Sequence, residues 1–342
     1  MRTTRRPTAP ETVPASLKTW LTDHVAAAGA RIARFEPMPS AASYRRFTRV
    51  VTDTGSLIAI EAPPGRENAR QFVALSAHFT RNRIPVPAVV ASDLERGFLL
   101  VDDLGDRHLH DVYGTDEETP AIAAAIDALV SIQRLPHDAL VPPYTRERLA
   151  DEFALCADWL VVRLLGIEPS VAVRRMLERT RDALIAKIAA QPTCTVHRDY
   201  HSRNLMWRDG RRLGILDFQD ALWGPACYDI ASLLRDCYHR FDEPTIARWR
   251  NYYHERACEW LAPIGRDELA EHVDWTALQR QIKAIGIFAR LEVRDGRDVH
   301  LADIPPVLDQ IVDSARRYAA TADLAEWLAS DVRGPVERAL TR

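Results

Sequence analysis

HRDYHSRN, residues 197–204, is followed closely by ILDFQD, residues 215–220. Asn204 lies five residues after Asp199, and Asp217 ends an apolar run thirteen residues after Asn204. Phosphoryl transfer needs a carboxylate near the acceptor hydroxyl, oxygen ligands for magnesium and positive charge on the phosphates. A strand–loop–strand can supply the first two, with Asp199 as the catalytic base and Asn204 and Asp217 as magnesium ligands. The spacing therefore favours a phosphoryl-transfer site over a solvated loop with a capping aspartate.

The residues around these three have less specific roles. We expect His197 to brace the loop by hydrogen bonding. Asp229 follows a Gly-Pro helix start, where we expect it to accept backbone N–H groups from the loop; substrate binding is the alternative. Asp220 stays open between a metal-facing or substrate-facing carboxylate and a turn residue.

The composition sets limits on the class of protein. The chain has 342 residues, 47% hydrophobic and 27% charged, with a net charge of −3, so no nucleic-acid surface or basic membrane patch is indicated. Its five cysteines form neither a CxxC pair nor a zinc-ligand spacing. The basic start lacks the apolar stretch of a signal peptide, and no run is long enough to span a membrane. We expect a cytoplasmic location and a monomer.

The first third alternates strand-like runs with turns. SYRRFTRVV (43–51) and SLIAIEA (56–62) flank a TDTG turn and predict a hairpin, and residues 65–82 predict a helix with Phe72, Leu75 and Phe79 on one face. IPVPAVVAS and GFLLV (97–101) read as two more strands. The expected order is strand, strand, strand, helix, strand, strand, in an antiparallel sheet with one inserted helix.

The rest of the chain has mainly helical periodicity, at 119–135, 147–165, 168–190 and from Pro225 to about Ala322, interrupted by strand-like runs at 193–197 and 213–218. This predicts an α+β, bilobal fold with a small sheet-rich N-lobe and a larger helical C-lobe. The expected boundaries are a disordered leader (1–16), the N-lobe (17–101), a hinge (102–105), the C-lobe with both motifs (106–322) and a C-terminal tail (323–342).

The catalytic stretch resembles the aminoglycoside phosphotransferase and choline kinase superfamily, whose members share the protein-kinase-like fold. From about Leu17 to Tyr318 the chain looks more narrowly like the bacterial anomeric kinases for N-acetylmuramate and N-acetylglucosamine of cell-wall recycling. The segments behind this resemblance are ASYRRFTRV (42–50), EAPPGRENARQF (61–72), GFLLVDDLGDR (97–107), LDFQDALWGPACYDIASLLRD (216–236), LQRQIKAIGIFARLEVRDG (278–296) and LADIP (301–305).

The resemblance implies ATP, magnesium and a sugar-1-phosphate product. It also places the acceptor pocket at the segment containing IKAIGIFARLEVRDG. An arginine near this pocket should neutralise the lactate carboxylate of N-acetylmuramate, and Arg203, Arg290 and Arg294 are the candidates.

One departure concerns the phosphates. Protein kinases end the third strand with a lysine, V-A-I-K, whereas the matching run here is Ile-Ala-Ile-Glu61. Arg45, Arg46 and Arg49 on the preceding strand are the candidate replacements, with Arg46 favoured by the resemblance. Strand alternation sends Arg45 and Arg49 to one face and Arg46 to the other.

A second departure is the phosphate loop, Pro-Ser-Ala-Ala-Ser at residues 39–43, which is short of glycine. Small residues still allow backbone N–H groups to approach a phosphate, and Ser43 is the candidate contact in this loop. Asp103, in the expected hinge, is a further candidate for nucleotide binding.

Other functions remain open at this point. One is a different small-molecule kinase of the superfamily, acting on an aminoglycoside, choline or another sugar. A protein kinase is disfavoured, because the few residues between Asp217 and Gly224 leave no room for a long activation segment. A non-catalytic nucleotide-binding pseudokinase is suggested by the missing lysine, but the base and both magnesium ligands are present.

Overall fold

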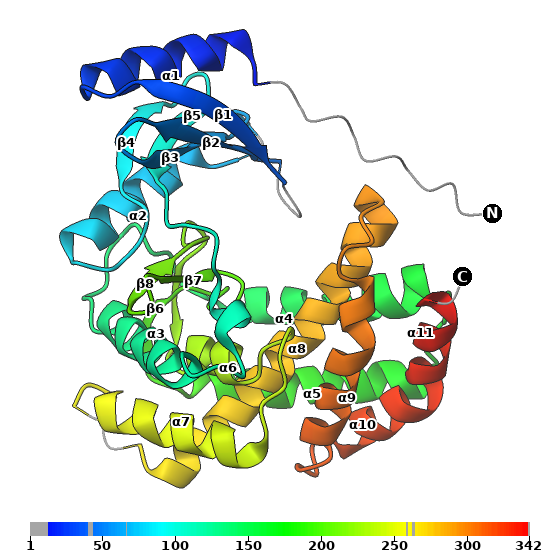
Figure 1. Cartoon of the computed structure of the whole chain (residues 1–342). Helices are drawn as coiled ribbons and strands as arrows, with labels where there is room; N and C mark the ends of the chain where they lie inside the picture. The colour runs from blue at the N-terminus through cyan, green and yellow to red at the C-terminus, as the bar shows by residue number, and fades with distance from the viewer. Residues whose placement is uncertain (1–12, 40–43, 66, 258, 262–263, 341–342) are drawn as a thin grey trace. The chain divides into compact units, whose positions relative to one another are not determined.

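The structure is a computed structural model that describes residues 13–39, 44–65, 67–257, 259–261 and 264–340. The chain folds into two compact units: unit 1 has the described residues up to Asp106 together with Gly214–Gln219, and unit 2 has Arg107–Leu213 and the described residues from Asp220 onward. Unit 1 carries the main sheet and unit 2 carries most of the helices (Figure 1). The expected α+β class, with a sheet-rich first part and a helical remainder, is confirmed.

Unit 1 is built on a five-stranded antiparallel sheet with the strand order β1-β2-β3-β5-β4. Its strands are β1 (Ile32–Met38), β2 (Arg46–Thr52), β3 (Ser56–Glu61), β4 (Val89–Asp93) and β5 (Phe98–Asp102). β2 and β3 form the expected hairpin, in which Arg46 lies opposite Glu61 and Val51 opposite Ser56. The predicted order of three strands, a helix and two strands is confirmed.

A helix that the sequence analysis missed covers one face of this sheet (Figure 1). This helix, α1 (Ala15–Ala27), begins inside the segment that was expected to be a disordered leader. Its buried residues include Leu17, Trp20 and Leu21, which belong to one hydrophobic cluster with Val50 of β2. Burial of these side chains against the sheet stabilises a segment whose periodicity was not recognised.

The second helix of unit 1, α2 (Ala69–Arg81), is the predicted one, and it buries Phe72, Leu75 and Phe79. The ring of Phe218 lies 4.8 Å from that of Phe72 and 5.8 Å from that of Phe79. This packing explains why residues 214–219 belong to unit 1, although the sequence analysis had grouped residues 215–220 with the helical part.

Unit 2 contains most of the helices and the strands of two small two-stranded sheets, except that Gly214 and Ile215, the last two residues of one strand, belong to unit 1. Its helical elements are η1 (Leu109–Val112), α3 (Glu118–Gln133), α4 (Arg146–Leu155), the π-helical η2 (Cys156–Leu164), α5 (Val171–Ala189), α6 (Tyr228–Leu234), α7 (Glu243–Ala257), α8 (Arg266–Asp295), η3 (Leu301–Asp303), α9 (Ile304–Ala315), α10 (Ala322–Trp327), the π-helical η4 (Leu328–Val332) and α11 (Arg333–Leu340). The strands β6 (Thr193–Val196) and β9 (Leu222–Pro225) pair with each other, and β7 (Leu205–Arg208) pairs with β8 (Arg212–Ile215).

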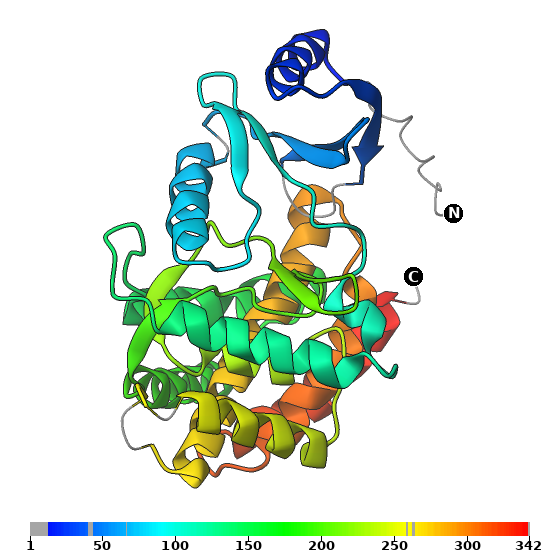
Figure 2. The same cartoon turned by 60° about the vertical axis from the view of Figure 1, so that its left-hand side comes forward.

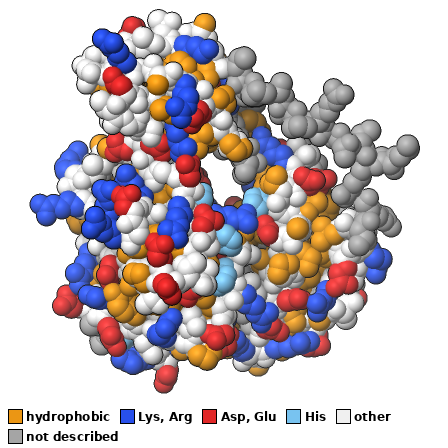
Figure 3. Space-filling view, viewed as in Figure 1, with side chains coloured by type: hydrophobic (Ala, Val, Ile, Leu, Met, Phe, Trp, Pro, Cys, Tyr) orange, Lys and Arg blue, Asp and Glu red, His pale blue; other side chains and the backbone are white. Residues whose placement is uncertain are grey.

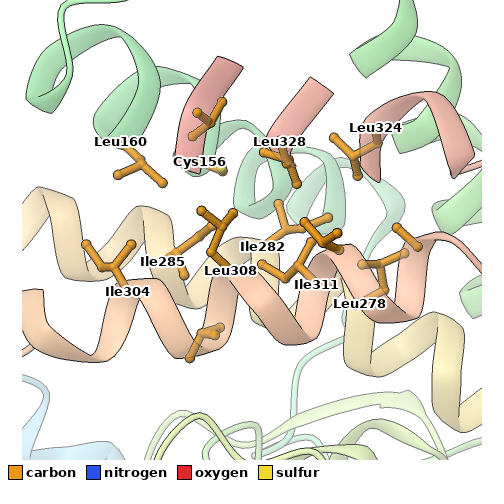
Figure 4. Packing of buried hydrophobic residues seen from close by; sticks show 14 of the residues in the cluster. Cys156, Leu160, Leu278, Ile282, Ile285, Ile304, Leu308, Ile311, Leu324 and Leu328 are labelled. Carbon is orange, nitrogen blue, oxygen red and sulfur yellow. The ribbon is translucent and has the colours of Figure 1, made fainter. Parts of the chain in front are cut away.

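The long helix α8 organises the core of unit 2 and can be followed through it in Figure 2. It contacts α4, η2, α5, α6, α7 and α9. Figure 4 shows Leu278, Ile282 and Ile285 of α8 packed among side chains from η2, α9 and the C-terminal helices. At Gly286 the backbones approach so closely that a Cβ atom would lie 2.4 Å from the backbone carbon of Leu155. The glycine therefore fixes how closely α8 can pack against α4 and η2.

The helices continue beyond Ala322, where the sequence analysis had set residues 323–342 apart as a tail. Leu324, Leu328, Val332 and Val336 are all buried in the same core cluster. Their spacing of four residues places them on one helix face, which is the pattern of an amphipathic helix packed on a core.

Two further features concern the helices of the described residues and the charge on one face of the surface. No helix in the described part of the chain is long and apolar enough to cross a bilayer. On the face shown in Figure 3, basic and acidic side chains are interspersed. This mixture fits a net charge of only −3.

Leu328→Ala tests whether the C-terminal helices belong to the core. Leu328 is buried, so we expect the substitution to lower the free energy of unfolding by about 2–5 kcal/mol, measured by urea denaturation. Val171→Ala, at a position that is 59% exposed, is the control and should change it by about 0.5 kcal/mol or less. Equal effects of the two substitutions would contradict the packing described here.

Candidate active site

The HRDYHSRN loop connects β6 to β7 and is held by two buried aspartates of unit 2. The carboxylate of Asp229, in the first turn of α6, accepts the backbone N–H groups of His197 at 2.6 Å and Arg198 at 2.9 Å. Asp236 accepts the N–H group of Ser202 at 2.9 Å. Burial raises the pKa of Asp229 to about 7, against the two N–H bonds, which favour its ionised form. The loop is thus fixed at both of its ends.

His197 lies inside this arrangement. It is buried, and its ring packs edge-on against Tyr200 at 5.5 Å. The backbone N–H group of Asp199 points at its Nδ1 atom at 3.3 Å. Both of these contacts of His197 lie within the loop, where a bracing side chain would make them.

Arg198 has a backbone φ of 77°, which is unfavourable for a residue other than glycine. Its guanidinium is held by the buried carboxylate of Glu152 of α4 at 2.7 Å and by the carbonyl oxygen of Asp220 at 3.4 Å. Glu152 also accepts a hydrogen bond from the hydroxyl of Tyr144 and lies 3.7 Å from Nζ of Lys283. These contacts offset the conformational strain and fix the residue next to Asp199.

Asp199 is surrounded by cations of unit 2. Burial opposes its ionisation, but the positive charges of Lys283, Arg198 and Arg280 help to lower its pKa to about 2. The carboxylate is therefore ionised at neutral pH and can accept a hydrogen bond from a hydroxyl group.

Asn204 closes the loop one residue before β7. Its Nδ2 donates to the carbonyl oxygen of Asp199 at 2.9 Å and lies 3.3 Å from Nε2 of His201. With the amide nitrogen engaged in this way, the amide oxygen is the group left to bind a cation. Burial lowers the pKa of His201 to about 4, so its imidazole is neutral beside this amide.

Asp217 lies in unit 1, just after β8, in a left-handed backbone conformation with φ of 62°. Its side chain is 49% exposed, and its carboxylate accepts a hydrogen bond from Nε2 of Gln219 at 2.7 Å. Nη1 of Arg45 lies 3.8 Å from the same oxygen, and Nη2 of Arg45 pairs with Glu67 at 3.0 Å. The guanidinium of Arg45 thus lies close to two carboxylates, those of Asp217 and Glu67.

The two arginines of β2, Arg46 and Arg49, have different partners from Arg45. Arg46 pairs at 3.0 Å with Glu61, the residue directly opposite it on β3. Arg49 pairs with Asp103 at 2.7 Å and also with Asp106. The carboxylate of Asp103 accepts further hydrogen bonds from the hydroxyl of Ser56 and the N–H group of Gly105. Arg46, Arg49 and Asp103 are therefore engaged within the sheet and its following turn.

Four of the remaining candidates lie in unit 2. Arg203 is exposed and stacks on the ring of Tyr238 at 3.8 Å. Arg290 is half-buried on α8, and its Nε has no hydrogen-bond partner among the described residues. Arg294 forms an ion pair with Asp295 at 2.8 Å. Asp220 is exposed in a turn, and Ser43 lies outside the described residues.

The sequence analysis missed three buried charged residues around Asp199, namely Glu152, Arg280 and Lys283. A signal was present for two of them, because Arg280 and Lys283 are three residues apart in a segment with helical periodicity, and this spacing places them on one helix face. Glu152 gave no such signal.

In the part of the chain that the structure describes, no three His, Cys, Asp or Glu side chains are grouped so as to hold a metal ion. A magnesium site in proteins often needs only one or two carboxylates besides phosphate oxygens and water. The half-exposed carboxylate of Asp217 and the amide oxygen of Asn204 are groups of this kind. Their chemistry fits magnesium, and they belong to different units.

Comparison with known proteins supports the resemblance read from the sequence. A family model described as "Phosphotransferase enzyme family" matches residues 34–272. An N-acetylmuramate/N-acetylglucosamine kinase of Pseudomonas putida is 38% identical over 85% of this chain and 86% of that protein. A protein of the same name from Neisseria meningitidis is 35% identical over 83% of this chain and 86% of its own length.

Solved structures with the same fold include a choline kinase and an aminoglycoside phosphotransferase. Choline kinase LicA from Streptococcus pneumoniae gives a TM-score of 0.65 at 10% identity, over 89% of this chain and all (100%) of that one. The ADP-bound aminoglycoside phosphotransferase APH(2'')-Ib gives a TM-score of 0.60 at 14% identity, over 86% of this chain and 97% of that one. The expected kinase-like fold is confirmed, and the chain belongs to the phosphotransferase enzyme family.

Proposed function

We propose that this protein is an ATP-dependent kinase that phosphorylates the anomeric hydroxyl of N-acetylmuramate and N-acetylglucosamine. The product would be the sugar-1-phosphate, in peptidoglycan recycling towards UDP-amino sugars. The observation that carries the kinase proposal is the ionised Asp199, held in a fixed loop beside the amide of Asn204. The choice of sugar is supported by the relatives of that name, which match over most of their length. A cytoplasmic location and a monomeric state stay predictions.

In this proposal Asp199 positions the acceptor. Its carboxylate accepts a hydrogen bond from the anomeric O–H group, whose oxygen attacks the γ-phosphorus of ATP. The bond from that phosphorus to the β–γ bridging oxygen breaks, and its electron pair leaves with ADP. A base with a pKa of about 2 takes the proton late, which suits an anomeric hydroxyl because it is more acidic than an ordinary alcohol.

Asn204 and Asp217 would hold magnesium. When bound, this ion neutralises charge on the phosphates of ATP. Asp217 supplies a negative charge and Asn204 a neutral oxygen. The left-handed conformation of Asp217 is one that Asp and Asn tolerate better than most residues.

Arg45 is our revised choice for the phosphate-binding cation. The resemblance favoured Arg46, but Arg46 pairs with Glu61, whereas Arg45 lies next to Asp217 and is oriented by Glu67. Protein kinases use a strand lysine paired with a helix glutamate to bind the phosphates. The pair of Arg45 and Glu67, just before α2, supplies the same charges.

Asp217→Asn should abolish turnover while the protein stays folded. The amide keeps the shape and the backbone preference of the side chain but removes the charge that compensates magnesium-bound phosphate. Steady-state rates at several magnesium concentrations and a thermal melt measure the two effects. Asp23→Asn, at an exposed position of α1, is the control. Activity above about a tenth of wild type would contradict the assignment, because losing a key electrostatic group costs more.

Alanine substitutions at positions 45, 46 and 49 test the phosphate-binding cation. We expect Arg45→Ala to lower kcat/KM for ATP by about 10²–10³-fold, and Arg45→Lys to restore only part of it, since lysine lacks the planar fork. Arg46→Ala should stay close to wild type, and Arg49→Ala should lower the melting temperature more than the rate. A larger loss for Arg46→Ala than for Arg45→Ala would reverse our choice.

The product and the base are tested together. Asp199→Asn should lower kcat by about 10²–10⁴-fold with ATP affinity largely kept, as expected for a positioned base. Phosphorus NMR of the wild-type product should show an acid-labile, non-reducing sugar-1-phosphate. A product that still reduces copper reagents would falsify the anomeric assignment and leave the kinase assignment standing. ATP binding without turnover on any sugar would instead indicate a pseudokinase.

A further inference from the structure

One buried arginine of unit 2 differs from the other buried arginines of the chain. The buried arginines among the described residues are Arg45, Arg198, Arg235 and Arg280. Arg45 pairs with Glu67, Arg198 with Glu152, and Arg235 with Glu243 and Asp274. Arg280 has no salt bridge with any described carboxylate. Its Nη1 atom makes a weak hydrogen bond to Sγ of Cys237 at 3.8 Å.

A buried guanidinium without an anion is costly, because its desolvation is not offset by an ion pair. The pKa of Arg280 is nevertheless raised overall, because burial lowers it but the nearby Cys237, Tyr228, Asp236 and Asp199 raise it by more. Asp236 already accepts the N–H groups of Ser202 and Tyr238, and in the proposed function Asp199 faces the acceptor. The position therefore suits a negatively charged group that arrives with a ligand.

A second arginine, Arg203, contacts Tyr238, which is the residue that follows Cys237 in the chain. The guanidinium of Arg203 stacks on the ring of Tyr238 at 3.8 Å, and among the described residues it forms no ion pair. Tyr238 itself lies 5.2 Å from the ring of His201, in the loop that carries Asp199. Stacking holds the plane of Arg203 while its nitrogen atoms stay exposed to a ligand.

Arg280 thus contacts Cys237 and Arg203 contacts Tyr238, so both arginines lie against the same two-residue segment near Asp199. Arg280 is buried and Arg203 is exposed. Arg294 is less suitable because it pairs with Asp295. Arg290 lies ten residues beyond Arg280 on α8, which is about 15 Å along a helix.

We propose that Arg280 and Arg203 bind the lactate carboxylate of N-acetylmuramate and so determine the preference for this sugar over N-acetylglucosamine. The inference rests on the proposed function and assigns the selectivity of its acceptor site. A carboxylate matches the planar fork of a guanidinium, and two such groups can share its two oxygens. N-acetylglucosamine lacks this carboxylate, so it would leave both arginines without an anionic partner.

The test compares three acceptors, N-acetylmuramate, its methyl ester and N-acetylglucosamine, on the full-length protein with ATP and magnesium. The measured quantity is kcat/KM for each acceptor and the ratio of the acid to each of the other two. Arg280→Met and Arg203→Met remove one guanidinium each. Arg266→Met changes an exposed arginine of the same helix, paired with Glu255, and serves as the control.

We expect each of the two variants to lower the ratio of N-acetylmuramate to N-acetylglucosamine by at least about tenfold, the loss typical of a hydrogen bond to a charged group. The discrimination between the acid and its methyl ester should fall by the same factor, since the ester already lacks the charge. Arg266→Met should leave both ratios unchanged. Should Arg280→Met fail to fold, Arg203→Met, at an exposed position, still decides the matter.

Equal losses for all three acceptors would overturn the inference, because they would place the arginines on the transferred phosphate. Unchanged ratios in both variants would overturn it as well. These outcomes leave the proposed kinase activity standing. A wild-type protein that phosphorylates neither sugar would instead overturn the proposed function, and the inference with it.

Discussion

The catalytic loop has its shape because two buried aspartates satisfy its backbone. A loop inside a protein must find partners for its N–H groups, since each one left without a partner costs free energy. Asp229 accepts two of them at the start of the loop, and Asp236 accepts that of Ser202 near its end. Both aspartates come from α6 and the residues that follow it. The placement of this short helix therefore determines where Asp199 can lie.

A second layer of charge determines what Asp199 can do. Glu152 of α4 holds Arg198, and Lys283 of α8 lies next to the same carboxylate. Each cation is thus fixed by a partner and still acts on Asp199. The carboxylate of Asp199 therefore stays ionised at neutral pH and acts as a hydrogen-bond acceptor. Such a group is suited to orienting a hydroxyl, and the rate then depends on the phosphates and the cations around them.

Much of this could be predicted from the sequence, and the failures have physical reasons. The β2–β3 hairpin and α2 were readable because they depend on local pattern. The spacing of Asp199, Asn204 and Asp217 is equally local, and the site it predicts stays a prediction. The helix α1 and the C-terminal helices were missed, because their stability comes from burial against distant parts of the chain. The preference for Arg46 over Arg45 is now revised, because strand alternation separates the two arginines but does not name their partners. Glu152, Arg280 and Lys283 could not be linked to the loop without the packing of α8.

Gly286 has a consequence for the chemistry as well as for the packing. It lies one helical turn from Lys283 and two turns from Arg280, at the point where α8 touches the backbone of Leu155. Any side chain there would push the helix outward and carry both cations with it. The positions of Lys283 and Arg280 relative to Asp199 therefore depend on a residue that has no side chain and takes no part in the reaction. A substitution at this position would disturb both the packing of α8 and the placement of the cations near Asp199.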